Sequence, residues 1–297
     1  MAIKPIPLLA LLLGLWITPV GATSLDVETI ATSLRQPAQH YRPLSASQLA
    51  QLEQGFDALL RADADSDTAA VRQSLEALGL RWHALDDGVL LLSDAEGNGI
   101  GHYLIRRNAS SSLLLQAPHQ FYDRHTGELA IELFRNGDMA VLALNSAHRR
   151  TAIDGRSGHA DIAHLNDTPF AALTRAFVRH HPQGSVVQLH GFAADKRTSA
   201  AGRSADIIVS SGQRWLLPAA QEVASCLMEN GPWQVRRYPL EVGELGGTTN
   251  TQGALLRQLG HGRFVHLELA REVRERLRSD PQTRSLFNTC LHRLEGP

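Results

Sequence analysis

The stretch Ser112–Glu132, SLLLQAPHQFYDRHTGELAIE, determines how the rest of this chain is interpreted. It opens with the apolar run Leu113–Leu115, which has the length of a buried strand. Pro118 ends the regular pairing because proline cannot donate a hydrogen bond to a neighbouring strand. His119 and Asp123 follow on the loop that leaves the strand. Imidazole and carboxylate groups bind first-row metals, and open α/β sheets place ligands at the carboxyl ends of strands.

Before this stretch the chain contains short strand-like runs. After it, strand-like and helical runs alternate. Alternation of this kind favours a largely parallel sheet that is covered on both faces. The predicted strands are 81–85, 89–93, 102–106, 113–116, 139–144, 186–189, 206–210, 233–237 and 263–269, and the later predicted helices are 127–134, 169–178, 218–229 and 271–278. No linker or repeat divides the chain, so we predict a single α/β domain over 23–297 with a mixed, mostly parallel sheet.

Residues 23–80 are predicted to form a helical cover over one face of the sheet. Leu49, Leu52, Phe56 and Leu59 recur at helical spacing, and a second helix is predicted to end near Gly79. We expect no catalytic residue in this region.

The first 22 residues are typical of a secretory signal peptide. Lys4 supplies the positive charge, Pro7–Val20 the apolar segment, and Val20–Ala22 the small residues of a cleavage site. The apolar segment is too short for a stable membrane span. We therefore expect a periplasmic or secreted protein, without a stable membrane span once the signal has been removed.

Composition narrows the class of protein further. The chain has 297 residues, 43% of them hydrophobic and 20% charged, with a formal net charge of −1. This is ordinary for a globular protein and gives no field that would attract nucleic acid. The two cysteines, Cys226 and Cys290, could pair in an oxidising compartment, but their spacing in the sequence leaves that open.

Two later strands supply further groups for a site. His190 ends the apolar run that begins at Ser185, so it repeats the arrangement of His119. If the two strands are parallel neighbours, both imidazoles emerge at the same edge. With Asp123 they give three protein ligands, which is the pattern of catalytic zinc. Glu268 lies in the apolar run 263–269, where burial would raise its pKa toward that of a general base; the alternative is an ion pair with Arg263 or Arg271.

The order of these groups resembles the zinc carboxypeptidase-like hydrolases, above all the poly-γ-glutamate hydrolases and N-formylglutamate amidohydrolases. The resemblance rests on scattered motifs between Leu113 and Leu269, including the late VHLEL strand. It implies a phosphorylase/hydrolase-like α/β fold, one zinc ion held by His119, Asp123 and His190, and Glu268 as the general base.

Two features depart from this pattern. The carboxylate lies one position nearer to His119 than the expected glutamate, so Glu128 or His125 could replace Asp123 as a ligand. No single arginine is identified as the group that holds a substrate carboxylate. The candidate substrate-binding residues are Arg149, Arg150, Arg197, Asn250 and Gln252, with Thr249 beside them.

A second cluster, His159, Asp161 and His164, is interpreted as a loop beside the site that could touch substrate. A metallophosphatase that uses this cluster is the weaker metal hypothesis. Ser210–Gly212 lacks the GxSxG pattern of a serine hydrolase. The sequence thus predicts an exported, metallopeptidase-like zinc hydrolase that cleaves a peptide-like or N-acyl amino acid amide. The competing hypothesis is a non-catalytic exported protein that keeps the fold for binding.

Overall fold

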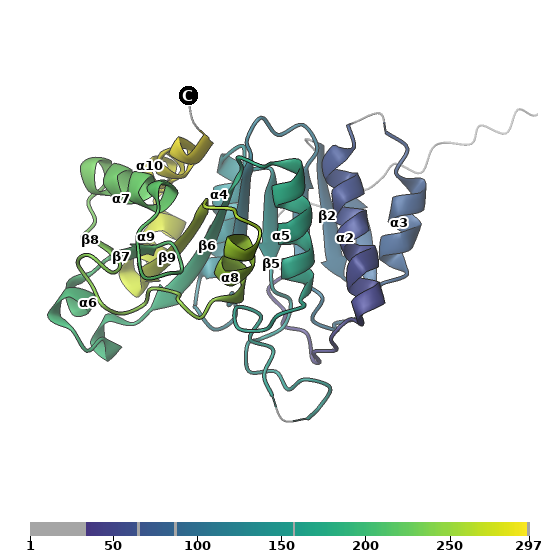
Figure 1. Cartoon of the computed structure of the whole chain (residues 1–297), viewed down its shortest axis with the longest axis horizontal. Coiled ribbons are helices and arrows are strands. Elements are labelled where there is room, and N and C mark those ends of the chain that lie inside the picture. The colour runs from purple at the N-terminus through teal and green to yellow at the C-terminus, as the bar shows by residue number, and fades with distance from the viewer. Residues whose placement is uncertain (1–33, 64–65, 86–87, 157, 296–297) are drawn as a thin grey trace, which may run out of the picture.

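The computed structural model describes residues 34–63, 66–85, 88–156 and 158–295. These residues form one nine-stranded sheet with helices on both faces (Figure 1). The predicted signal segment, 1–22, and the beginning of the predicted helical cover lie outside the described residues. No helix within the described ranges has both the length and the apolar character needed to cross a membrane.

The nine predicted strands are all present, with ends that differ by at most three residues. The strands are β1 (Leu80–Ala84), β2 (Val89–Asp94), β3 (His102–Arg106), β4 (Leu113–Ala117), β5 (Val141–Leu144), β6 (Ser185–Phe192), β7 (Ile207–Ser210), β8 (Val235–Arg237) and β9 (Phe264–Ala270). The helices are α2 (Ala46–Arg61), α3 (Ala69–Glu76), α4 (Thr126–Asn136), α5 (Pro169–His180), α6 (Ala200–Ser204), α7 (Pro218–Asn230), α8 (Thr251–Gln258), α9 (Arg271–Ser279) and α10 (Pro281–His292). The sequence did not predict α6, α8 or α10.

The strand order is β1-β2-β3-β5-β4-β6-β9-β7-β8. The central strands β5, β4, β6 and β9 are parallel to one another, and β8 is parallel to β7. The pairs β1–β2, β2–β3, β3–β5 and β7–β9 are antiparallel. The mixed α/β sheet is therefore confirmed, although its pairings are four parallel and four antiparallel rather than mostly parallel.

The order in which strands are added to the sheet reverses at β4. From β4 it passes through α4 to β5 on one side, and from β5 it passes through α5 to β6 on the other side of β4. β4 and β6 are thus parallel neighbours at a topological switch point, where α/β sheets open a crevice at their carboxyl edge. This confirms the expected pairing of the strands that lead to His119 and His190.

Both faces of the sheet are buried. Leu113 and Leu115 of β4 join a core with α4, α7, α9 and α10, while Leu114 joins a second core with α2, α3, α5 and α8 (Figure 1). This alternation explains why β4 is a continuous apolar run, since each successive side chain meets a covering helix. A disulfide joins Cys226 of α7 to Cys290 of α10, with their Cα atoms 5.4 Å apart, and so resolves the open question of their pairing.

Candidate metal centre

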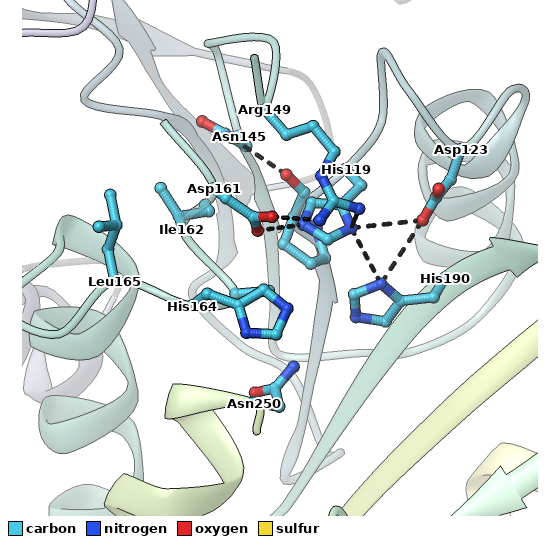
Figure 2. A network of polar contacts seen from close by, with 12 residues as sticks. His119, Asp123, Asn145, Arg149, Asp161, Ile162, His164, Leu165, His190 and Asn250 are labelled. Carbon is cyan, nitrogen blue, oxygen red and sulfur yellow. Dashed lines mark hydrogen bonds and ion pairs between the residues drawn. The ribbon is translucent and has the colours of Figure 1, made fainter. Parts of the chain in front are cut away.

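Three buried side chains meet at the carboxyl edge between β4 and β6 (Figure 2). The Nδ1 atoms of His119 and His190 lie 3.2 Å apart. Each of these atoms lies 3.5 Å from Oδ2 of Asp123. The structure therefore brings together the three residues that the sequence suggested as ligands, and they form a group able to hold a metal ion.

Backbone contacts fix the loop that carries two of these residues. The N–H of Asp123 donates to the carbonyl of His119 at 2.8 Å, which closes one helical turn and places both side chains on the same side. The Oγ1 of Thr126 donates to the carbonyl of Asp123 at 2.7 Å. Asn145, just after β5, donates from Nδ2 to the carbonyl of Pro118 at 3.0 Å, so that the neighbouring strand holds the start of the loop.

Asp161 fixes the tautomer of His119. The Nε2 of His119 lies 2.7 Å from Oδ1 of Asp161, and a carboxylate oxygen can only accept here, so Nε2 carries the hydrogen (Figure 2). The lone pair of the neutral ring is then on Nδ1, where Nη1 of Arg149 also approaches to 3.3 Å. Arg149 pairs with Asp161 as well. The loop that carries Asp161 is held by Thr251, at the start of α8, whose N–H donates to the carbonyl of Ala163 at 2.8 Å.

A chain of amides fixes the tautomer of His190. Asn250 caps α8, and its Oδ1 accepts from the backbone N–H groups of Gln252 and Gly253. Its Nδ2 is therefore the atom that donates to Oε1 of Gln188 at 2.5 Å. The same Oε1 lies 2.8 Å from Nε2 of His190, so Nε2 donates and Nδ1 of His190 bears the lone pair.

Three acceptor atoms thus face a common point. Two neutral imidazole nitrogens and a carboxylate oxygen at separations of 3.2 to 3.5 Å repel one another unless a proton or a cation lies between them. Tetrahedral zinc with bonds of about 2.0 to 2.1 Å places its ligand atoms about 3.3 Å apart. The outer ring nitrogens donate to oxygens of Asp161 and Gln188, as those of metal-binding histidines donate to protein oxygens. These residues therefore fit a zinc ion.

The electrostatics of the cluster also favour positive charge at its centre. Burial alone would lower the pKa of His119, but Asp123 and Asp161 outweigh it and raise that pKa. Burial alone would raise the pKa of Asp123, yet His119 and His190 hold it well below its usual range. For His190 burial prevails, and its pKa is lowered. His190 accordingly remains neutral and Asp123 remains charged, as metal ligands must.

Glu268 lies in β9 directly opposite His190 in the β6–β9 register. Burial raises its pKa to about 8. It forms no ion pair with Arg263 or Arg271, because Arg263 donates to Oγ of Ser185 at 3.0 Å and Arg271 pairs with Glu275 at 2.8 Å. Glu268 also forms a second candidate metal-binding group with His190 and His266.

A cavity of about 560 Å³ lies over this group. Of the suggested substrate-binding residues, Arg149, Arg197 and Asn250 line it, as does Thr249. Arg150 and Gln252 are not among the residues that line it. Arg150 lies over the ring of Tyr122, 5.0 Å from its centre. Gln252 is buried behind the site, where its Oε1 accepts from Thr174 at 2.8 Å.

Glu128 and His125, which the sequence left open as replacements for Asp123, both lie outside the ligand group. Glu128 pairs with Arg278 of α9 at 2.7 Å, and His125 lies 3.2 Å from the same arginine.

The cluster of His159, Asp161 and His164 is divided between the surface and the site. His159 is exposed, whereas Asp161 contacts His119 and His164 lines the cavity. The sequence missed the roles of Asp161 and Gln188, although Gln188 gave a signal as a polar residue within an apolar strand.

No known protein family model matches the chain, and no curated protein matches it. Among solved structures, the chain is similar to the zinc-free form of the protein YNDL, with 16% identity over 66% of this chain and 89% of that chain and a TM-score of 0.42. It is similar to N-formylglutamate amidohydrolase from Ralstonia eutropha JMP134, with 13% identity over 66% and 96% of the chains and a TM-score of 0.45. It is also similar to a bacteriophage poly-γ-glutamate hydrolase, with 14% identity over 63% and 84% and a TM-score of 0.39. The last two names are those of the groups that the sequence motifs resemble.

Proposed function

We propose that this protein is an exported zinc-dependent hydrolase that cleaves an amide bond in a peptide-like or N-acyl amino acid substrate. One observation carries the proposal: the three acceptor atoms of His119, Asp123 and His190 lie at the separations of tetrahedral zinc ligands. The predicted signal segment supports a periplasmic or secreted location.

Three protein ligands leave a position for water and substrate, as in catalytic rather than structural zinc sites. The chemistry that zinc supplies in such a site is Lewis-acid activation of water and of a carbonyl oxygen. Asp161 and Gln188 accept hydrogen bonds from the outer ring nitrogens and so keep both imidazoles oriented toward that position.

Glu268 is proposed as the general base. It lines the same cavity as the three ligand residues, on the strand next to His190. Burial raises its pKa to about 8, above that of an ordinary carboxyl group, which suits a group that accepts a proton from water and passes it to a leaving amine. Among the described residues the carboxyl group forms no hydrogen bond, and its Oε1 lies 3.9 Å from Nε2 of His266.

The test is to measure zinc content and hydrolysis for the wild type, Glu268→Gln and the control Glu272→Gln, an exposed glutamate four residues further along the chain. Loss of a general base lowers turnover by about 10²- to 10⁴-fold. We expect this loss in Glu268→Gln with zinc retained, and no change in Glu272→Gln. Equal turnover in all three would refute the role of Glu268, and zinc binding without turnover of any N-acyl amino acid or peptide would favour a non-catalytic binding protein.

A further inference from the structure

A circuit of buried hydrogen bonds lies behind His190. The Nε2 of Gln188 donates to Oε1 of Gln116 at 2.9 Å, and Nε2 of Gln116 donates to Oγ1 of Thr174 at 3.0 Å. The hydroxyl of Thr174 donates in turn to Oε1 of Gln252 at 2.8 Å. None of these four polar side chains is more than 1% exposed. Through Gln188, His190 is therefore connected to a residue, Gln252, that does not line the cavity.

The polar circuit crosses two strands and a helix and returns to the helix at which it starts. Gln116 of β4 and Gln188 of β6 are partners in the parallel register. Thr174 lies in α5, and Gln252 lies in the first turn of α8. Asn250, whose Nδ2 donates to Gln188, is the N-cap residue of the same helix. The start of α8 therefore holds both ends of the circuit.

The amides of the circuit can only turn over together. If Gln188 turned over, its Nε2 would face His190 and its Oε1 would face Oε1 of Gln116, so Gln116 would have to turn over as well. Gln116 would then present its Oε1 to Thr174, whose hydroxyl would donate to Gln116 instead of to Gln252. Because a buried polar group without a partner is costly, the two directions of donation are alternatives for the whole circuit.

The direction of donation decides which ring nitrogen of His190 carries the lone pair. In the observed direction Oε1 of Gln188 accepts from Nε2 of His190, and the lone pair lies on Nδ1. In the opposite direction the NH₂ group of Gln188 would donate to Nε2, and the hydrogen of the neutral ring would move to Nδ1. Asn250 favours the observed direction at one end, because its Oδ1 already accepts from backbone N–H groups. Gln252 supports it at the other end, because it supplies the acceptor for the hydroxyl of Thr174.

We propose that Gln252 and Thr174 are positioning residues for His190, which help to keep the lone pair of its Nδ1 directed at the metal position. The assignment rests on the proposed zinc site and deepens it, since it names residues that set metal affinity from outside the cavity. The Nε2 of Gln252 has no hydrogen-bond partner among the described residues, which agrees with a role for its oxygen alone.

The first test uses the variant Asn250→Ser, in which the amide donor at one end is absent and the other end sets the direction. Adding Gln252→Met removes the acceptor of the Thr174 hydroxyl, which regains a partner only if the amides turn over. The nitrogen NMR signals of His190 in the zinc-free protein should then shift toward the tautomer with the hydrogen on Nδ1, and zinc affinity should fall about threefold. Adding Gln258→Met instead, at an exposed position of α8, should change neither. An unchanged tautomer or an unchanged zinc affinity after Gln252→Met would overturn the assignment.

A second comparison separates this role from simple packing. Thr174→Val removes the hydroxyl through which Gln252 acts, so Gln252→Met should have no further effect once Asn250→Ser and Thr174→Val are both present. An equal effect with and without the hydroxyl would show that methionine only disturbs the packing of α8, and would contradict the proposal. Because the tautomer is measured without zinc, failure here is distinguishable from failure of the proposed hydrolase, which would appear as absent zinc uptake or turnover.

Discussion

The Nδ1 atoms of His119 and His190 face each other at 3.2 Å, and when both rings are neutral neither has a hydrogen to place between them. Asp161 and Gln188 determine this, because each accepts the hydrogen of the outer ring nitrogen. The hydrogen bonds to Asp161 and Gln188 therefore help to orient the two imidazole rings as metal ligands. Changes to these supporting contacts should alter metal affinity without touching a ligand.

Asp161→Asn should weaken zinc binding. The amide can present its NH₂ group to His119, which favours the tautomer with the hydrogen on Nδ1 and removes the lone pair from the cluster. Loss of such a supporting contact costs about 10- to 100-fold in metal affinity. Competition with a chromophoric zinc chelator measures the change, and Asp195→Asn, at an exposed aspartate, is the control. Identical zinc affinity in Asp161→Asn and the wild type would contradict the tautomer assignment.

Asn250→Asp should weaken zinc binding more than Asn250→Ser does. Both replacements can cap α8, but aspartate places an acceptor against Oε1 of Gln188, where Asn250 now donates at 2.5 Å. Rotation of the Gln188 amide would relieve the repulsion and turn its NH₂ group toward His190. Serine leaves Gln188 held by its hydrogen bond to Oε1 of Gln116 at 2.9 Å. Stronger zinc binding in Asn250→Asp than in Asn250→Ser would refute the claim that Asn250 orients His190 through Gln188.

Acid should destabilise the fold through His102 of β3, which is not one of the three ligand residues. Burial lowers the pKa of His102 to about 4, opposed by the weaker effect of Asp94. Because the unfolded chain binds the proton near pH 6.5, this contribution is present above about pH 6.5 and is lost as the pH falls toward 4. The lost contribution is about 3 kcal/mol. Urea unfolding at pH 7 and pH 4.5 should show a smaller pH effect in His102→Gln than in His159→Gln, at an exposed histidine; equal pH effects would contradict it.

The disulfide should stabilise the fold without affecting the metal. Cys226 and Cys290 are 64 residues apart in the sequence, and closing a loop of this length in the unfolded chain contributes about 4 kcal/mol. The double variant Cys226→Ser, Cys290→Ser should lose about this much in urea unfolding while it keeps the zinc affinity of the wild type. A loss of zinc affinity would show that the α7–α10 contact also positions the site.

The sequence allowed the strands and the ligand candidates to be predicted for one reason. Residues 113–117 and 185–192 are mostly apolar because helices cover both faces of the sheet. His119 lies two residues after the end of the first run, and His190 lies two residues before the end of the second. Parallel pairing then brings the two histidines to one edge. Asp123 could be predicted as the third ligand because it lies one helical turn after His119.

The supporting residues could not be predicted in the same way. Asp161 reaches His119 across 42 positions from a loop without a periodic pattern, and Asn250 acts on His190 through Gln188, 62 positions away from it. Contacts of this kind depend on the tertiary arrangement, on which local sequence patterns carry no information.

Zinc content per chain tests the central claim most directly. The purified wild type and the exposed-site control His159→Ala should each bind one zinc ion by mass spectrometric metal analysis, and His119→Ala and His190→Ala should bind none or bind far more weakly. A wild type that takes up no zinc, or ligand variants that retain it as tightly as the control, would contradict the account.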